Sequence, residues 1–247
     1  MLPPNRRNKF KKLKMIKHVC VFFIYNNIEH IIKSFESIQK PNIDYFIIEN
    51  KSENSNQIQE YFSTKNLKGY IQFKENITNN AIEIFLKDYK ELLLKYDYIT
   101  ITDGDLEVED IDSTFKEIIK NLNLENIGVS CVDLTLDNFP YHIPNSNTWL
   151  PSNCITTKEY IECSTGVYLM TLKKENIELL YSGKFIDSAI ASRTKSQNLK
   201  WVKTKLNKAY HLTWDLYVKG NPYYEFKIQN IDHIWNHSSI SPYLKII

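Results

Sequence analysis

The residues best suited to chemistry are two aspartates separated by one glycine, Asp103-Gly104-Asp105, directly after the apolar run 98–102. That run predicts a buried strand, and a buried strand rarely ends in paired acids without a cation to neutralise them. Alternate residues of an extended chain point to the same side, so Asp103 and Asp105 can converge on one ion. Carboxylates suit Mg²⁺ or Mn²⁺, which often keep positions for substrate phosphates. The motif therefore predicts a metal–diphosphate site, with Gly104 leaving space for the ligand.

An isolated Asp-Gly-Asp can also be a simple turn, because Asp and Gly are common turn residues. A calcium-binding EF-hand loop is excluded by spacing, since it needs glycine at Val108 and glutamate at Thr114. The wider pattern favours the metal site, because several polar residues follow predicted strand ends. These residues are Asn26, Glu49, Asn50, Ser52, Asp103 and Asp105.

Strands and helices must alternate along the chain to position these groups. Apolar runs predict strands at 18–25, 45–48, 70–73, 98–102 and 127–132. Amphipathic stretches predict helices at 28–39, 56–64, 79–95 and 111–121. This alternation indicates an α/β domain with a central, mostly parallel sheet flanked by helices, in which ligands bind at the carboxyl ends of the strands. No dinucleotide or Walker A phosphate loop is present in the sequence.

The second half of the chain has a different composition. Residues 133–163 are rich in Pro, Asn and aromatic residues and predict a long loop or short strands, whose rings either bind sugars or fill the core. Strands are predicted at 163–170, 201–204 and 209–212, and helices at 175–181 and 184–198. The last 25 residues, with His233 and His237, show no clear pattern. We expect one domain, made of a tail (1–16), a nucleotide-sugar-binding half (17–132) and an acceptor-binding, catalytic half (133–247).

Charge is distributed unevenly over the 247 residues. The net charge is +2, yet residues 1–17 carry seven Lys or Arg and no acid, so the rest of the chain is acidic. Such a tail is either solvated or binds anionic lipid, and the acidic body argues against a nucleic-acid partner. No apolar run is long enough to span a bilayer, and no secretory signal is visible. The four cysteines lack C-x-x-C pairing, so we expect them to be reduced, as in a cytoplasmic protein. The basic tail would bring this protein into peripheral contact with the inner membrane.

Ordered landmarks over roughly 17–214 resemble GT-A nucleotide-sugar glycosyltransferases, and glycosyltransferase family 2 above all. The landmarks are the strand end Tyr25-Asn26-Asn27, then Glu49-Asn50-Lys51-Ser52, Asp103-Gly104-Asp105, Ser164-Thr165-Gly166, the pair Asp187 and Arg193 six residues apart, and His211. The chain departs from the family pattern in three places. Glu49 stands where Asp is usual, and Ile186 stands where a second acid often precedes the catalytic Asp. Ser188-Ala189 replaces a more acidic continuation after Asp187.

The resemblance implies a GT-A (Rossmann-like) fold and roles for individual residues. Asp105, with Asp103 and His211, would hold Mn²⁺ or Mg²⁺, Asp187 would be the catalytic base, and Arg193 would orient Asp187 or bind phosphate. The remaining nucleotide-sugar-binding positions would be Tyr25, Asn26, Glu49, Asn50, Ser52, Gly104 and Gly166. The implied reaction is inverting transfer of a hexosyl or N-acetylhexosaminyl group from a UDP-sugar to a glycan or lipid-linked hydroxyl, in bacterial surface polysaccharide or lipopolysaccharide synthesis.

Two other functions fit the same residues in part. A nucleotidyltransferase acting on a sugar phosphate could use the same sheet and acids, but residues 26–29 do not form the Gly- and basic-rich loop that such enzymes use. A non-catalytic sugar-binding protein would need no metal site. Structural explanations also exist for Glu49 as a solvated strand end, Asp187 as a helix N-terminal residue and His211 as a core histidine.

Overall fold

The computed structural model describes residues 16–143, 146, 150–151, 153–164, 166–181, 185, 187–229 and 243–246. The basic tail, apart from its last residues, therefore lies outside the described part, as do His233 and His237. Within the described ranges, no helix has both the length and the apolar character needed to cross a membrane.

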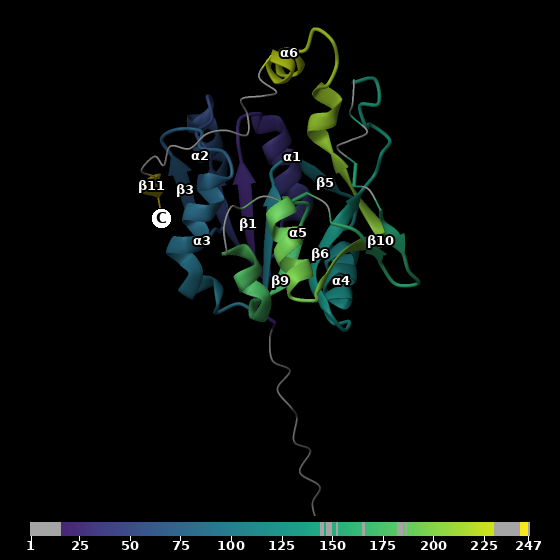
Figure 1. Cartoon of the computed structure of the whole chain (residues 1–247). Helices are drawn as coiled ribbons and strands as arrows, with labels where there is room; N and C mark the ends of the chain where they lie inside the picture. Colours follow the sequence, from purple (N-terminus) through teal and green to yellow (C-terminus); the bar gives the residue numbers. More distant parts are fainter. Residues whose placement is uncertain are drawn as a thin grey trace, which may run out of the picture.

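Four parallel strands form the first half of the sheet (Figure 1). They are β1 (His18–Ile24), β2 (Ile43–Glu49), β3 (Gly69–Phe73) and β4 (Tyr98–Asp103), in the spatial order β3-β2-β1-β4. The helices between them are α1 (Ile28–Ile38), α2 (Ser55–Ser63) and α3 (Asn80–Leu93). In the register of β1 with its two neighbours, Phe23 lies opposite both Ile48 and Asp103. The carboxyl ends of β1, β2 and β4 are therefore level with one another.

The second half continues the sheet beyond β4. Its strands are β5 (Leu106–Val108), β6 (Ile127–Leu134), β7 (Ile155–Thr156), β8 (Ile161–Glu162), β9 (Met170–Lys173) and β10 (Lys200–His211). β9 is antiparallel between β4 and β6, β10 pairs with β6 in parallel, and β5 pairs with the end of β10. The helices are α4 (Ile111–Leu122), the 3₁₀ helices η2 (Lys174–Leu180) and η3 (Leu212–Leu216), α5 (Asp187–Ser196) and α6 (Pro222–Gln229). A last strand, β11 (Tyr243–Ile246), is antiparallel to β3.

Alternate residues of the buried strands fill a core on each face of the sheet. In β1, Val19 and Val21 belong to the cluster beneath α3, η2 and α5, whereas Cys20 and Phe22 belong to the cluster beneath α1, α2 and α4. Helices therefore cover both faces, which explains the continuous apolar character of β1 and β4. The predicted α/β fold with a central, mostly parallel sheet is confirmed.

Three predicted strands and one predicted helix differ in the structure. Of the run predicted at 163–170 only Met170 lies in a strand, because Leu169 has a left-handed backbone (φ 46°) and Tyr168 N donates to Gly166 O. The runs predicted at 201–204 and 209–212 are one strand, β10, with extra residues between the paired positions Lys203 and Lys208. The helix predicted at 175–181 is the 3₁₀ helix η2.

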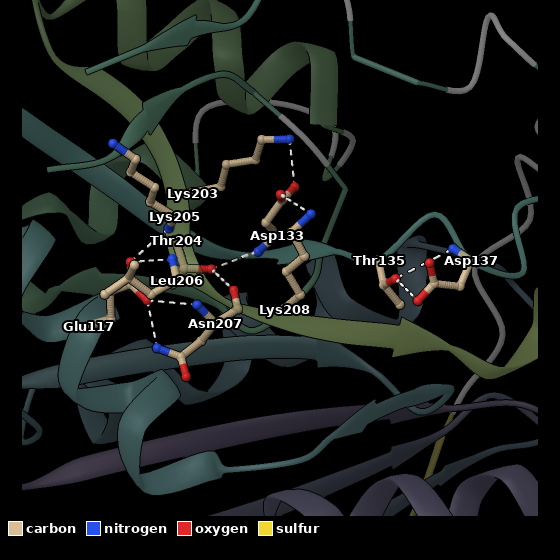
Figure 2. Close-up of polar contacts among 10 residues, drawn as sticks. All are labelled: Glu117, Asp133, Thr135, Asp137, Lys203, Thr204, Lys205, Leu206, Asn207 and Lys208. Carbon is tan, nitrogen blue, oxygen red and sulfur yellow. Dashed lines mark hydrogen bonds and ion pairs between the residues drawn. The ribbon is translucent and has the colours of Figure 1, made fainter. Parts of the chain in front are cut away.

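Glu117 of α4 holds the extra residues of β10 in place (Figure 2). Its carboxylate accepts hydrogen bonds from the backbone N–H groups of Lys205 (2.7 Å), Leu206 (3.1 Å) and Asn207 (3.0 Å). Burial raises the pKa of Glu117, but these hydrogen bonds and one from the Asn207 side chain outweigh burial and keep the pKa below its ordinary value. These hydrogen bonds thus hold the insertion in a defined conformation, in which the Leu206 side chain points into solvent and the residue is 84% exposed.

The expectation of four reduced cysteines is wrong. The structure joins Cys154 and Cys163 in a disulfide, while Cys20 and Cys131 are free and buried. The two partners flank the short hairpin of β7 and β8, whose antiparallel pairing brings residues nine apart in sequence together. A C-x-x-C search cannot find such a pair, because the pairing depends on the hairpin and not on a local motif.

Candidate active site

The Asp103-Gly104-Asp105 segment is packed tightly against the ends of β1 and β10. A side chain at Gly104 would place its Cβ 2.7 Å from Ile24 Cγ2 and 3.0 Å from Phe23 O, so only glycine fits this position. Beyond it, Leu106 N donates to Ser34 Oγ (3.2 Å) of α1, and Leu212 N donates to Asp105 O (2.8 Å). These bonds fix the backbone of Asp105 at the carboxyl edge of the sheet.

Asp105 and His211 come together from distant parts of the chain. Asp105 Oδ2 lies 3.6 Å from His211 Nδ1 and accepts a hydrogen bond from the Thr213 hydroxyl (2.5 Å). β5 positions the pair, because Leu106 is opposite His211 in the antiparallel ladder with β10. Within the described part of the chain, Asp105 Oδ1 and His211 Nδ1 are buried and have no hydrogen-bond partner.

Buried polar atoms without partners are costly, so this pair needs an explanation. A divalent cation such as Mn²⁺, held by the Asp105 carboxylate and the His211 imidazole, would give both atoms a partner. Among the described residues, no group of three or more His, Cys, Asp or Glu could hold a metal ion. A cation here would therefore have two firm protein ligands, with its other positions open to water or phosphate oxygens.

Tyr168 lies near three of the predicted acidic residues, and the sequence patterns did not single it out. Burial raises its pKa, and the neighbouring charges of Asp103, Asp105 and Asp187 raise it further. Its ring meets the His211 ring edge-on, with centroids 5.7 Å apart. The structure thus brings three of the predicted acids and His211 near one partly buried, neutral phenol.

Gly166 is required by the same tyrosine. A Cβ at Gly166 would lie 2.6 Å from the Tyr168 ring and 2.8 Å from its hydroxyl. The small residue that the sequence predicts to line the donor therefore lets the Tyr168 ring fold back against the chain.

Asp187 is the first residue of α5, where the helix dipole favours a negative charge. Surrounding protein desolvates its carboxyl and raises its pKa to about 6, although part of the residue stays open to solvent. Arg193 lies in the last turn of α5, where its Nε donates to Leu179 O (2.6 Å), and Glu83 is a nearby charge. Arg193 therefore lies at the opposite end of the helix from Asp187. These contacts do not support the implied role of Arg193 in orienting Asp187.

Glu49 is buried and holds a loop together. It is 0% exposed, and its carboxylate accepts hydrogen bonds from Ser52 N (3.1 Å) and from the hydroxyls of Ser55 and Tyr70. Both carboxylate oxygens therefore have protein partners. Glu49 thus shapes the loop after β2, and its contact with the nucleotide stays an expectation from the resemblance.

Asn50, Ser52 and Asn26 also tie loops together at this edge. Asn50 is 2% exposed, and its side chain accepts from Ile77 N (2.9 Å) and donates to Asn76. Asn26 N donates to Ser52 Oγ (2.8 Å), and Asn26 itself has a left-handed backbone (φ 50°). The first two strand ends are thereby locked to each other, beside Tyr25, whose side chain is 42% exposed.

Two further residues whose pKa values respond to the charge of Asp105 were not predicted. The pKa of His30, in the first turn of α1, is lowered by burial, and the charges of Asp105 and Asp215 oppose that shift. Burial raises the pKa of Tyr223 in α6, and Tyr217 and Asp105 add to the effect. In Figure 1, α6 lies beyond the end of the sheet to which the β1 arrow points. No sequence pattern pointed to Tyr223, because α6 has no marked amphipathic pattern.

Sequence comparison finds relatives without an assigned function. The chain matches no protein family model. It is 33% identical to uncharacterized protein L142 of Acanthamoeba polyphaga mimivirus, over 88% of this chain and 48% of that protein. It is 34% identical to uncharacterized protein L137 of the same virus, over 93% of this chain and 34% of that protein. The chain thus spans half or less of the length of these relatives.

Structure comparison gives a clearer result. The mannosyltransferase PcManGT from Pyrobaculum calidifontis, solved in complex with GDP-Man and Mn²⁺, matches with a TM-score of 0.58 and 15% identity, over 92% of this chain and 66% of that chain. At this identity the likeness is evidence for the fold alone. The chain has the predicted GT-A-type α/β fold.

Proposed function

We propose that this protein is a metal-dependent glycosyltransferase that moves a sugar from a nucleotide-sugar to a hydroxyl group of a glycan acceptor. The observation that carries the proposal is the pairing of Asp105 with His211, whose buried Oδ1 and Nδ1 atoms lack partners in the described structure. The fold supports the proposal because this pair lies at the carboxyl edge of a GT-A-type sheet, and the His211 ring contacts Tyr168.

Asp105 and His211 are the proposed metal ligands, and Thr213 holds the Asp105 carboxylate in place through its hydroxyl. A bound Mn²⁺ or Mg²⁺ supplies Lewis-acid stabilisation of the departing diphosphate. Asp103, at the end of β4, is proposed to face the ribose or a metal-bound water. The mannosyltransferase PcManGT was solved with Mn²⁺, which makes Mn²⁺ the first ion to test.

Asp187 is proposed to accept the proton of the acceptor hydroxyl as that oxygen attacks the anomeric carbon from the face opposite the leaving group, which gives inversion. A pKa of about 6 suits this role, because the carboxylate is mostly ionised at pH 7 yet more basic than an ordinary aspartate. Tyr168 is near enough to Asp103, Asp105 and Asp187 for their charges to raise its pKa, so its phenol stays neutral beside them.

The nucleotide is proposed to bind over the ends of β1 and β2, where Tyr25 offers an exposed ring. This places the donor in residues 17–132 and the acceptor in residues 133–247. PcManGT was solved with GDP-Man, so GDP-sugars belong in a donor screen beside the UDP-sugars that the sequence favours. The relatives are viral proteins, and they lend no support to a role in bacterial surface polysaccharide synthesis.

The test is hydrolysis or transfer with a panel of UDP- and GDP-sugars, with Mn²⁺, with Mg²⁺ and with a chelator. We expect metal-dependent release of the nucleoside diphosphate from one donor and loss of that release in Asp105→Asn. A nucleotidyltransferase would instead release pyrophosphate from a nucleoside triphosphate and a sugar phosphate. Release of pyrophosphate with no turnover of any nucleotide-sugar would overturn the proposal.

A further inference from the structure

Four aromatic rings form a continuous series from the proposed metal site to the protein surface. The His211 ring stacks on Trp214 with centroids 4.7 Å apart and planes 3° apart. Trp214 meets Phe139 edge-on at 4.8 Å, and Phe139 meets Tyr141 at 4.7 Å. Trp214 and Phe139 are 8% and 5% exposed, whereas Tyr141 is 62% exposed. The series therefore ends in the exposed ring of Tyr141, which packs on the buried rings of Phe139 and Trp214.

The loop that carries Tyr141 is anchored on both sides of that residue. Before it, Asn138 Nδ2 donates to His211 O (2.8 Å) and to Asp215 Oδ1 (3.1 Å). After it, His142 Nε2 lies 2.6 Å from Tyr217 O. The loop is thus held to the segment that follows β10, and the exposed ring of Tyr141 has a defined position.

Strand order places this ring on the side of the site away from the proposed nucleotide position. β1 and β2 lie on one side of β4 in the sheet, and β6 and β10 lie on the other. The Tyr141 loop follows β6 and packs on residues that follow β10. A ligand on Tyr141 would therefore approach Asp105 and His211 from the half of the sheet that the nucleotide does not use.

We infer that Tyr141 is the stacking platform of an acceptor subsite that takes a pyranose ring of a glycan. Sugar rings present a patch of C–H groups, and an aromatic face is the matching apolar surface, while a tyrosine keeps a polar tip for hydroxyl groups. A single exposed apolar residue is ordinary on a protein surface. Tyr141 differs because its loop is anchored on both sides and its ring series leads to the proposed metal ligand. The inference rests on the proposed function in naming the ligand an acceptor.

The experiment compares the full chain with three variants on an immobilised oligosaccharide array with hexose, N-acetylhexosamine and uronic-acid termini. We expect the wild type to bind a subset of glycans, Tyr141→Ala to bind them about ten-fold more weakly, and Tyr141→Phe to bind within about two-fold of wild type, because it keeps the ring face. Leu206→Ala is the matched control. Leu206 is also an exposed apolar side chain, but it lies on the β10 insertion (Figure 2).

The array needs no sugar donor, so its result is separate from the test of catalysis. Equal glycan binding by Tyr141→Ala and wild type, or no glycan binding by wild type, would overturn the inference that Tyr141 stacks on a sugar ring. This holds even if a nucleotide-sugar is turned over. Binding that depends on Tyr141 but not on Leu206 would support the platform. If no donor is turned over in that case, the proposed transferase function fails while the sugar site stands.

Discussion

His18 makes the stability of the fold depend on pH in a way that can be calculated. The residue begins β1 and is 5% exposed, its Nε2 lies 2.7 Å from Thr100 Oγ1, and the Phe115 ring meets it edge-on at 4.8 Å. Burial and, to a smaller extent, the charge of Lys40 lower its pKa from 6.5 to about 3. The folded protein therefore holds a neutral imidazole at pH values where the unfolded chain binds a proton.

The sign and size of the effect follow from these two pKa values. Between about pH 6.5 and pH 3 the unfolded state binds more protons than the folded state, so stability falls as the pH falls. With 1.36 kcal/mol for each pKa unit, His18 should cost about 2 kcal/mol of unfolding free energy between pH 7 and pH 5. At pH 3 and below the loss should approach about 4–5 kcal/mol.

Urea unfolding of wild type and His18→Gln at pH 7 and pH 5 isolates this contribution. Glutamine cannot titrate and keeps a polar group near Thr100, so the difference between the two proteins removes the contributions of all other groups. We expect wild type to lose about 2 kcal/mol more than His18→Gln over this interval. Equal losses in the two proteins would refute the account of His18.

Three other predictions concern the site and the tail. Asp187→Asn should lower turnover by about 10²–10⁴-fold with an unchanged donor KM. Wild-type turnover at saturating metal should rise with pH through about 6, as the Asp187 carboxylate forms. A pH-independent rate from pH 5 to 8 would contradict this role of Asp187. Gly104→Ala should destabilise the protein by about 1–3 kcal/mol in thermal unfolding, because its Cβ would meet Ile24 and the Phe23 carbonyl; an unchanged Tm would refute the packing. Deleting residues 1–14 should reduce binding to anionic liposomes, and undiminished binding would exclude membrane contact through the tail.

The arrangement of strands and helices was predictable because apolar runs and amphipathic stretches report burial directly. The strand predicted at 163–170 was wrong because Leu169 adopts a left-handed backbone, which residue composition does not reveal. The insertion in β10 depends on Glu117, which is far away in sequence. The Cys154–Cys163 disulfide likewise depends on a hairpin that no local motif marks.

The site was predictable in part. Acids at strand ends could be found from the rule that ligands bind at the carboxyl edge of parallel sheets, and Asp103 and Asp105 were found in this way. The role of Glu49 could not be read from its position, since only the structure reveals that Ser52, Ser55 and Tyr70 occupy its carboxylate. Tyr168 was missed because a phenol that lies near several acids has no motif of its own.

The central claim is that Asp105 and His211 hold a divalent cation that a nucleotide-sugar needs in order to react. The most direct measurement is Mn²⁺ titration of wild type, Asp105→Asn and His211→Gln by calorimetry, with UDP or GDP present, and with Leu206→Ala as a control. We predict nucleotide-dependent Mn²⁺ binding in wild type and the control, and at least ten-fold weaker binding in both site variants. Mn²⁺ binding of equal strength in all four proteins, or no binding in wild type, would contradict the claim.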